Sequence, residues 1–142
     1  MTHAAIRFSE AQRRAADAFM AEFAEQHAGE FIEDICRLHR TWEAAPPGEA
    51  AGACRLLAHD LSGLGDTFGF PLVTSLCRSL CRFLKLRGGA LDGAREVIAV
   101  HMDALRLIAA ERVRGDGGPI GREITEELAR AVRKFDLEYA EG

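Results

Sequence analysis

The sequence predicts an all-α protein, an antiparallel four-helix bundle with additional helices at its N- and C-termini. Apolar residues recur with helical spacing along most of the 142 residues, and no convincing alternation typical of a strand occurs. Glycine and proline gather in short clusters between these segments, as expected for tight turns. Because short turns join amphipathic helices, neighbouring helices are expected to pack antiparallel.

The first flanking helix is expected at about residues 10–28. Ser9 followed by Gln12 is a capping-box pattern, which is typical of a helix start. Gly29 is expected to interrupt or end this helix. Helical spacing of apolar residues resumes over 31–42, where the bundle core begins.

Turn residues divide the rest of the expected bundle core, about 30–113, into three more helices. Two prolines and a glycine at 46–48 predict a break. The next helix should run from about Glu49 to Leu64, and another should begin at Pro71, a residue suited to a first helical turn. The last core helix is expected at about 92–113.

A further helix is expected at about 120–138, after the glycine-rich turn that ends at Pro119. Its apolar stripe consists of Ile124, Leu128, Ala131 and Phe135. Such a stripe favours docking on the bundle, with binding to a partner as the alternative. The first helix is also expected to pack outside the bundle core.

Composition excludes several classes of protein. A chain of this length is expected to form one domain, and a net charge of −4 argues against general nucleic-acid binding. No apolar run reaches the roughly 20 residues of a membrane span, and the N-terminus has no signal-peptide pattern. We therefore expect a cytoplasmic protein without membrane contact, whose four cysteines are reduced and mostly fill the core.

One histidine stands out in the helix expected between Glu49 and Leu64. On a helical wheel, His59 lies nearly opposite the apolar stripe and is therefore predicted to face solvent. Its neighbours one turn away are Arg55, Ser62 and Gly63. The stripe itself consists of Ala50, Cys54, Leu57, Leu61 and Leu64.

These neighbours suit phosphoryl chemistry. A neutral imidazole nitrogen can act as a nucleophile and form a covalent intermediate. Gly63 leaves room for a phosphoryl group and for a partner, and a glycine within a helix costs about 1 kcal/mol relative to alanine, so its presence needs a reason. Arg55 can pair with phosphate oxygens, and the Ser62 hydroxyl can donate a hydrogen bond to them.

The run from Ala58 to Gly63, followed by Gly69, resembles the signature of histidine-containing phosphotransfer (HPt) domains. The family pattern is a histidine, any residue, a leucine or similar residue, commonly a lysine, and then a glycine, with a second glycine further on. His59, Leu61, Gly63 and Gly69 match this pattern, whereas Ser62 replaces the usual lysine. The resemblance covers the expected bundle core and leaves out both flanking helices.

The resemblance implies a four-helix bundle whose exposed histidine carries phosphate between aspartates of receiver domains, in response regulators or hybrid histidine kinases. It also implies that the Mg²⁺ belongs to the receiver and that this chain itself holds no cofactor or metal. With no ATP-binding motif visible, we expect a phosphorelay intermediate rather than an autonomous kinase. The family is usually monomeric, and we therefore expect a monomer.

Ser62, in place of the usual lysine, removes a positive charge that should stabilise the bound phosphate. Arg55 could compensate, as could Arg78 and Arg82 on the expected solvent side of the following helix. The basic residues of this region are most simply a solvated face, or they border the receiver-docking surface; they are Arg78, Arg82, Lys85 and Arg87.

Two alternatives remain open at this stage. Ser62 is compatible with a non-catalytic module that binds receivers without turning over phosphate. Cys77 and Cys81 lie one helical turn apart and could serve a metal or redox protein, although no paired motif supports that reading. His101 lies on an apolar stripe and is predicted to be a core histidine bonded to a neighbour.

Overall fold

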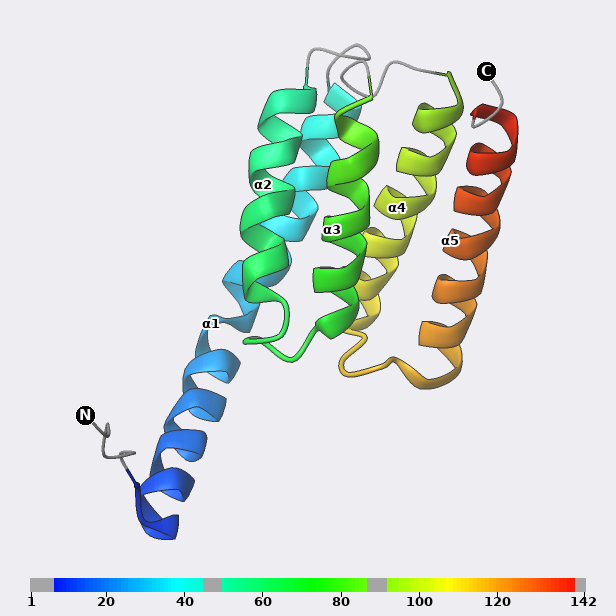
Figure 1. The fold of residues 1–142 in the computed structure, drawn as a ribbon. Coiled ribbons are helices and arrows are strands. Elements are labelled where there is room, and N and C mark those ends of the chain that lie inside the picture. Colours follow the sequence, from blue (N-terminus) through cyan, green and yellow to red (C-terminus); the bar gives the residue numbers. More distant parts are fainter. Residues whose placement is uncertain (1–6, 45–49, 87–91, 140–142) are drawn as a thin grey trace, which may run out of the picture.

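Five α-helices follow one another along the described residues, 7–44, 50–86 and 92–139 of this computed structural model (Figure 1). No strand occurs in these ranges. The predicted all-α class is therefore confirmed. The helices are α1 (Glu10–Ala44), α2 (Ala51–Leu64), α3 (Pro71–Leu84), α4 (Asp92–Glu111) and α5 (Gly118–Tyr139).

The first four helices enclose one apolar core. α1 packs against α2 and α4, and α3 also packs against both of these helices, so the four form a closed ring. Burial of apolar side chains inside this ring is the main stabilising contribution to such a bundle. The largest core residues that are almost completely buried include Ile35, Leu38, Leu61, Phe70, Leu80, Phe83, Ile98, Leu105 and Ile108.

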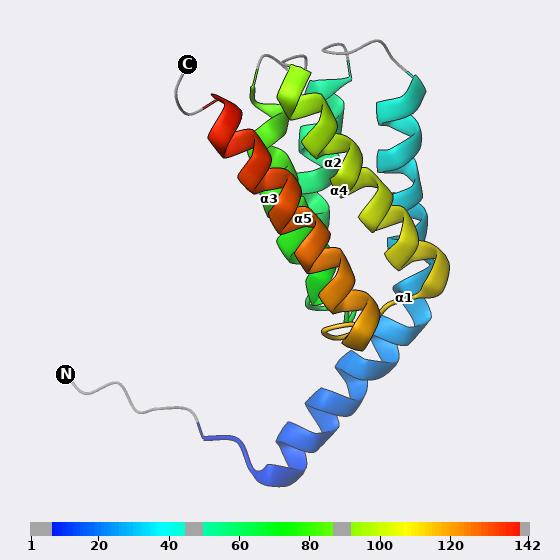
Figure 2. The same cartoon turned by 90° about the vertical axis from the view of Figure 1, so that its right-hand side faces the viewer.

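The last helix docks on the outside of this ring, over α3 and α4 (Figure 2). Ile124 and Phe135 of α5 are buried. The ring of Phe135 meets that of Phe83 edge to face, with centroids 5.2 Å apart, and Arg82 donates a hydrogen bond of 2.8 Å to Asp136. The prediction that this helix docks on the bundle is confirmed.

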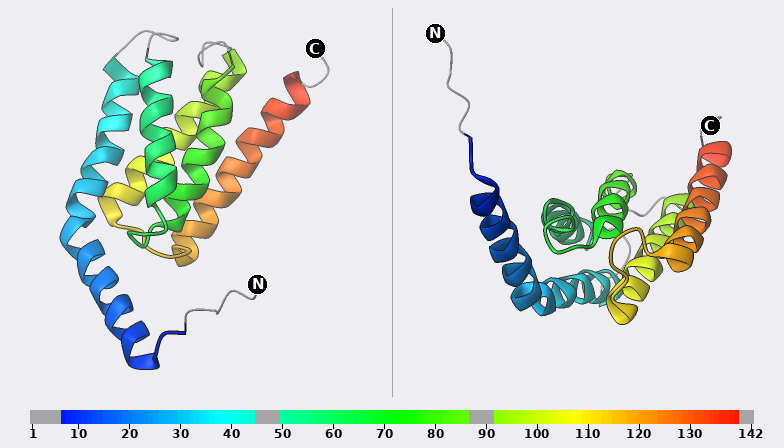
Figure 3. Two further views of the ribbon diagram at one scale, coloured as in Figure 1. Left: turned by 60° about the vertical axis from the view of Figure 1, so that its left-hand side comes forward. Right: turned by 90° about the horizontal axis from the view of Figure 1, so that it is seen from below.

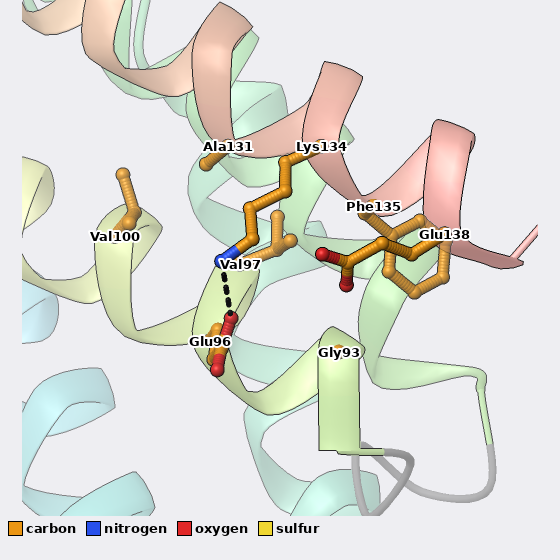
Figure 4. A pocket seen from close by; sticks show the side chains of 8 residues that line it. All are labelled: Gly93, Glu96, Val97, Val100, Ala131, Lys134, Phe135 and Glu138. Carbon is orange, nitrogen blue, oxygen red and sulfur yellow. Dashed lines mark ion pairs between the residues drawn. The ribbon is translucent and has the colours of Figure 1, made fainter.

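The seam between α4 and α5 contains a small hollow of about 190 Å³ (Figure 4). Its apolar lining includes Val97, Val100 and Phe135. Lys134 of α5 reaches across to Glu96 of α4, and their charged atoms lie 3.7 Å apart. This exposed ion pair bridges the two helices, while the apolar contacts beneath it supply most of the docking energy.

The start of α1 follows the predicted capping box. The backbone N–H of Ser9 donates to Oε1 of Gln12 at 2.8 Å, and the backbone N–H of Gln12 donates to Oγ of Ser9 at 3.1 Å. These reciprocal bonds satisfy donors that the first helical turn leaves free.

The expected helix break at Gly29 is wrong. α1 continues without interruption through this residue, and a Cβ placed there would meet no atom within 4 Å. One interior glycine costs only about 1 kcal/mol, and α1 packs against α2 and α4 beyond it, which offsets that cost. The break expected around Pro46 lies outside the described residues.

The first part of α1 was expected to pack against the outside of the bundle core, and this prediction is wrong. Its buried residues begin only at Ala28, and residues 10–23 are all exposed. This segment projects beyond the end of the bundle (Figure 3). We call residues 10–26 the α1 arm.

Two turns meet at the end of the bundle from which the arm projects. Gly69, in the turn between α2 and α3, has φ of +84°, a conformation that favours glycine. Its carbonyl accepts a hydrogen bond of 3.0 Å from the backbone N–H of Gly115 in the α4–α5 turn. Arg114 adds a bond of 3.3 Å to the carbonyl of Phe68 and lies over the ring of Phe70. These contacts fix α2 and α3 relative to α4.

Gly65, directly after α2, allows the chain to pass close to α3. A Cβ at this position would lie 2.8 Å from the carbonyl oxygen of Phe70 and 2.8 Å from the backbone nitrogen of Thr74, and it would overlap the Thr74 hydroxyl. Two of these three atoms belong to the backbone and cannot move without shifting α3.

Gly65→Ala should therefore destabilise the protein by about 1–3 kcal/mol, the usual cost of overpacking a tight contact. The matched control is Gly52→Ala, because a Cβ at Gly52 in the exposed face of α2 would meet nothing within 4 Å. This control should leave stability unchanged or raise it by up to about 1 kcal/mol through helix propensity. Urea denaturation measures both, and equal stabilities of the two variants would contradict the packing described.

Candidate functional site

The buried face of α2 differs slightly from the predicted stripe. Leu64 is 40% exposed, and the prediction of a core position for it was wrong. Ala58, which is fully buried, replaces it on the core side. The helix ends at Leu64, and the chain then turns towards α3, so that its last turn leaves the core. The buried residues of α2 are Ala51, Cys54, Ala58 and Leu61.

The side chain of His59 is exposed on the outer surface of α2. Because Ala58 is buried, the next residue is rotated by about 100° away from the core. His59 lies in a shallow groove of about 240 Å³ between α2 and α3. Arg55 and Leu56 of α2 line this groove together with Cys81 and Lys85 of α3.

Two cations give the groove a positive character. Both Arg55 and Lys85 lower the pKa of the Cys81 thiol, although burial, the largest influence, raises that pKa overall. The thiol lies 4.0 Å from the carbonyl oxygen of Arg55. The groove thus places positive charge beside an exposed imidazole, an arrangement that favours an anionic group attached to His59.

Ser62 and Gly63, one helical turn after His59, differ in what they offer to the imidazole. A Cβ at Gly63 would meet no atom within 4 Å, so this side of the imidazole is open. The Ser62 hydroxyl donates a hydrogen bond of 2.7 Å to the carbonyl oxygen of His59. Its expected donation to a phosphate is therefore replaced by a bond within the helix, a common arrangement for serine.

The remaining predicted site residues do not line the groove. Gly69 shapes the turn between α2 and α3, and neither Arg78 nor Arg82 lines the groove. The Arg82 guanidinium is bonded to Asp136 of α5 and lies over the Phe83 ring. The positive charge in the groove beside His59 thus comes from Arg55 and Lys85.

Sequence reasoning did not place Leu56 or Lys85 beside His59. Leu56 is 70% exposed next to the imidazole and offers an apolar contact to an approaching surface. Lys85 lies one helical turn after Cys81, at the end of α3. The register of α2 against α3 brings it to His59, and helical periodicity within one segment contains no information on that register.

The cysteines give little support to a metal or redox site. Burial raises the pKa of the Cys77 thiol to about 12 and that of Cys54 to about 11. Thiols with such pKa values remain protonated near neutral pH and are poor metal ligands and nucleophiles. Within residues 7–44, 50–86 and 92–139, no three His, Cys, Asp or Glu side chains are grouped to hold a metal ion.

His101 is a core residue, as predicted. It is fully buried, and its Nδ1 lies 2.7 Å from the carbonyl oxygen of Val97, to which it donates. Nε2 then accepts from the Ser79 hydroxyl at 2.8 Å. Burial lowers the pKa of His101, only partly opposed by the bond to Val97. The side chain is therefore neutral and structural.

None of the helices in residues 7–44, 50–86 and 92–139 combines enough length with enough apolar character to cross a membrane.

Comparison with known families places most of the chain in one of them. The family model of the Hpt domain matches residues 25–133, which include the part of α1 that packs in the bundle, helices α2, α3 and α4, and the greater part of α5. Among curated proteins and among solved structures, none matches the chain.

Stability should decrease in mild acid because of His101. Its pKa in the folded state lies below the ordinary value of 6.5, so the unfolded state binds the proton more readily as the pH falls below about 6.5. The free energy of unfolding should therefore drop between about pH 7 and pH 5. His101→Phe, which cannot titrate, should show a flatter dependence in urea denaturation at each pH. Parallel curves for the two proteins would contradict a neutral buried histidine.

Proposed function

Because the chain belongs to the Hpt domain family, we propose that it is a histidine phosphotransfer protein of a two-component phosphorelay, with His59 as its phosphoacceptor. The observation that carries this proposal is the position of His59. Its imidazole is exposed on α2, with open space at Gly63 and a cationic groove on the other side.

In the proposed transfer, an unprotonated imidazole nitrogen of His59 attacks the phosphorus of an aspartyl phosphate on a receiver domain. The N–P bond forms as the P–O bond to the aspartate breaks, and the bonding electron pair leaves with the carboxylate. The reverse step delivers the phosphoryl group to the aspartate of a second receiver. The divalent cation of this chemistry is assigned to the receiver, so no residue of this chain is proposed to hold it.

Arg55 and Lys85 are proposed to stabilise the phosphoryl oxygens. The usual lysine three residues after the histidine is Ser62 here, and its hydroxyl is bonded to the His59 carbonyl. The two cations lie on the opposite side of the imidazole, in the groove between α2 and α3. Charge-assisted hydrogen bonds to phosphate are stronger than neutral ones, so two such groups can replace one lysine.

Leu56 and the open surface at Gly63 are proposed to meet the receiver. An exposed leucine beside the reacting group supplies apolar contact area, and a residue without a side chain permits close approach. Arg78 and Arg82 remain candidates for the border of this surface. We further propose that the protein acts in the cytoplasm, where receivers of response regulators or hybrid histidine kinases would be its partners.

A second function, receiver binding without phosphate transfer, is favoured by one specific feature. This feature is Ser62, which stands where the family pattern commonly has a lysine. A chain that binds receivers without accepting phosphate would keep the bundle and the docking surface. Binding of a receiver without labelling of the chain would support this second function.

The acceptor role predicts the outcome of a direct transfer assay. Radiolabelled phosphate on a purified receiver should move to the native chain within the lifetime of the aspartyl phosphate. His59→Gln should accept no label, because its side chain amide is not a nucleophile, and should keep the helical circular dichroism and thermal unfolding of the native chain. His39→Gln, which changes a histidine on α1, is the matched control and should accept label normally. Label on His59→Gln would contradict the assignment.

The groove cations predict a graded effect on the same assay. Arg55→Ala and Lys85→Ala should each slow transfer by about tenfold, the loss expected for one charge-assisted hydrogen bond. Arg133→Ala removes an exposed arginine from α5 and should leave the rate unchanged. Thermal unfolding should be the same for all three variants. Unchanged rates for both groove variants would refute the role proposed for these cations.

A further inference from the structure

The α1 arm carries an unusual concentration of exposed apolar side chains. Phe19 is 65% exposed, Met20 47% and Phe23 38%. Within residues 7–44, 50–86 and 92–139, no other helix exposes three large apolar side chains in so short a segment. Contiguous exposed apolar groups of this kind mark interaction surfaces more often than idle ones.

These side chains form a stripe that is continuous along the arm. Phe19 and Phe23 are one turn apart, and Ala15 and Ala16 extend the same face towards the start of the helix. At the base of the arm, the ring of Phe23 stacks near that of Phe68, with centroids 6.4 Å apart. Beyond this contact the stripe is not covered by α2, α3, α4 or α5 of its own chain in the described residues.

A helical segment of this length gains little stability on its own. Isolated helices shorter than about 12–15 residues are marginal in water, and most helices in proteins are stabilised by burial of an apolar face. The arm is hardly longer than this limit, and its apolar face is exposed. Burial of that face against a second surface would supply the missing stabilisation.

The charges of the arm indicate which surface fits. The first part of the arm, residues 10–14, carries Arg13, Arg14 and the single acidic residue Glu10, which pairs with Arg14 at 3.2 Å, so its net charge is positive. The later part, residues 15–26, has no basic residue and carries Asp17, Glu22 and Glu25, of which Glu25 lies 3.7 Å from Arg114 of the bundle. Two arms side by side in the same direction would bring like charges together, whereas two antiparallel arms bring each positive part next to the negative part of the other.

We propose that the α1 arm binds the α1 arm of a second copy of this chain as an antiparallel helix pair. In this pairing the aromatic rings of one arm pack against the small alanines of the other, an alternation of large and small residues that suits close helix packing. The proposal replaces the expectation of a monomer. It is independent of phosphate transfer, because none of the residues of the arm lines the groove at His59.

The oligomeric state of the full chain tests the proposal. Light scattering coupled to size-exclusion chromatography, across about two decades of concentration, should reveal a concentration-dependent dimer. Phe19→Glu should weaken the dimer by about tenfold or more, since it places a charge in an apolar contact. Leu137→Glu is the matched control, because Leu137 on α5 is 69% exposed, and it should dimerise like the native chain.

Charge reversal tests the antiparallel orientation. The double variant Arg13→Glu, Arg14→Glu should lose dimer affinity, because negative parts then lie side by side. Adding Asp17→Arg and Glu22→Arg reverses both parts and should restore the native affinity. Circular dichroism and thermal unfolding of the bundle should be similar for all variants.

Three outcomes would overturn the proposal. A chain that stays monomeric at all concentrations would exclude the second copy and leave the arm as a surface for a different protein. A dimer unaffected by Phe19→Glu would place the interface elsewhere. A dimer that the quadruple reversal does not restore would exclude the antiparallel arrangement. None of these outcomes bears on the transfer assay, so the two proposals succeed or fail separately.

Discussion

The contact between α2 and α3 is the constraint on which the site depends. α2 presents small side chains to the core, with Cys54 and Ala58 fully buried, and Gly65 lets the chain turn back within contact distance of the α3 backbone. Since Ala58 is fixed inside, His59 must lie outside. Close packing therefore determines which imidazole meets solvent, and any change that rotates α2 by one residue would bury the proposed phosphoacceptor.

The same contact determines where the positive charge lies. The groove at His59 exists only because the end of α3 runs beside the middle of α2, which brings Lys85 and Cys81 next to Arg55. The serine that stands where related proteins commonly have lysine is bonded to its own helix. In this chain the neighbouring helix thus supplies a cation to the groove at His59, a feature that depends on tertiary packing and not on the motif.

Features encoded by local interactions could be predicted from the sequence, and those encoded by packing could not. The capping box of Ser9 and Gln12 and the buried position of His101 follow from spacing within one helix, and both were predicted correctly. The break at Gly29 was wrong because tertiary contacts outweigh the propensity of one residue. The approach of Lys85 to His59 was not predicted, because it depends on the register between two helices, which no single-helix pattern contains.

The central claim is that one exposed imidazole on α2 carries the phosphoryl group. Mass spectrometry of peptides from the chain, after exchange with a phosphorylated receiver and under conditions that preserve phosphoramidate bonds, tests this most directly. We expect a single phosphoryl group, bonded to a ring nitrogen of His59. A phosphoryl group found on any other side chain, or a chain that binds the receiver and stays unmodified, would contradict it.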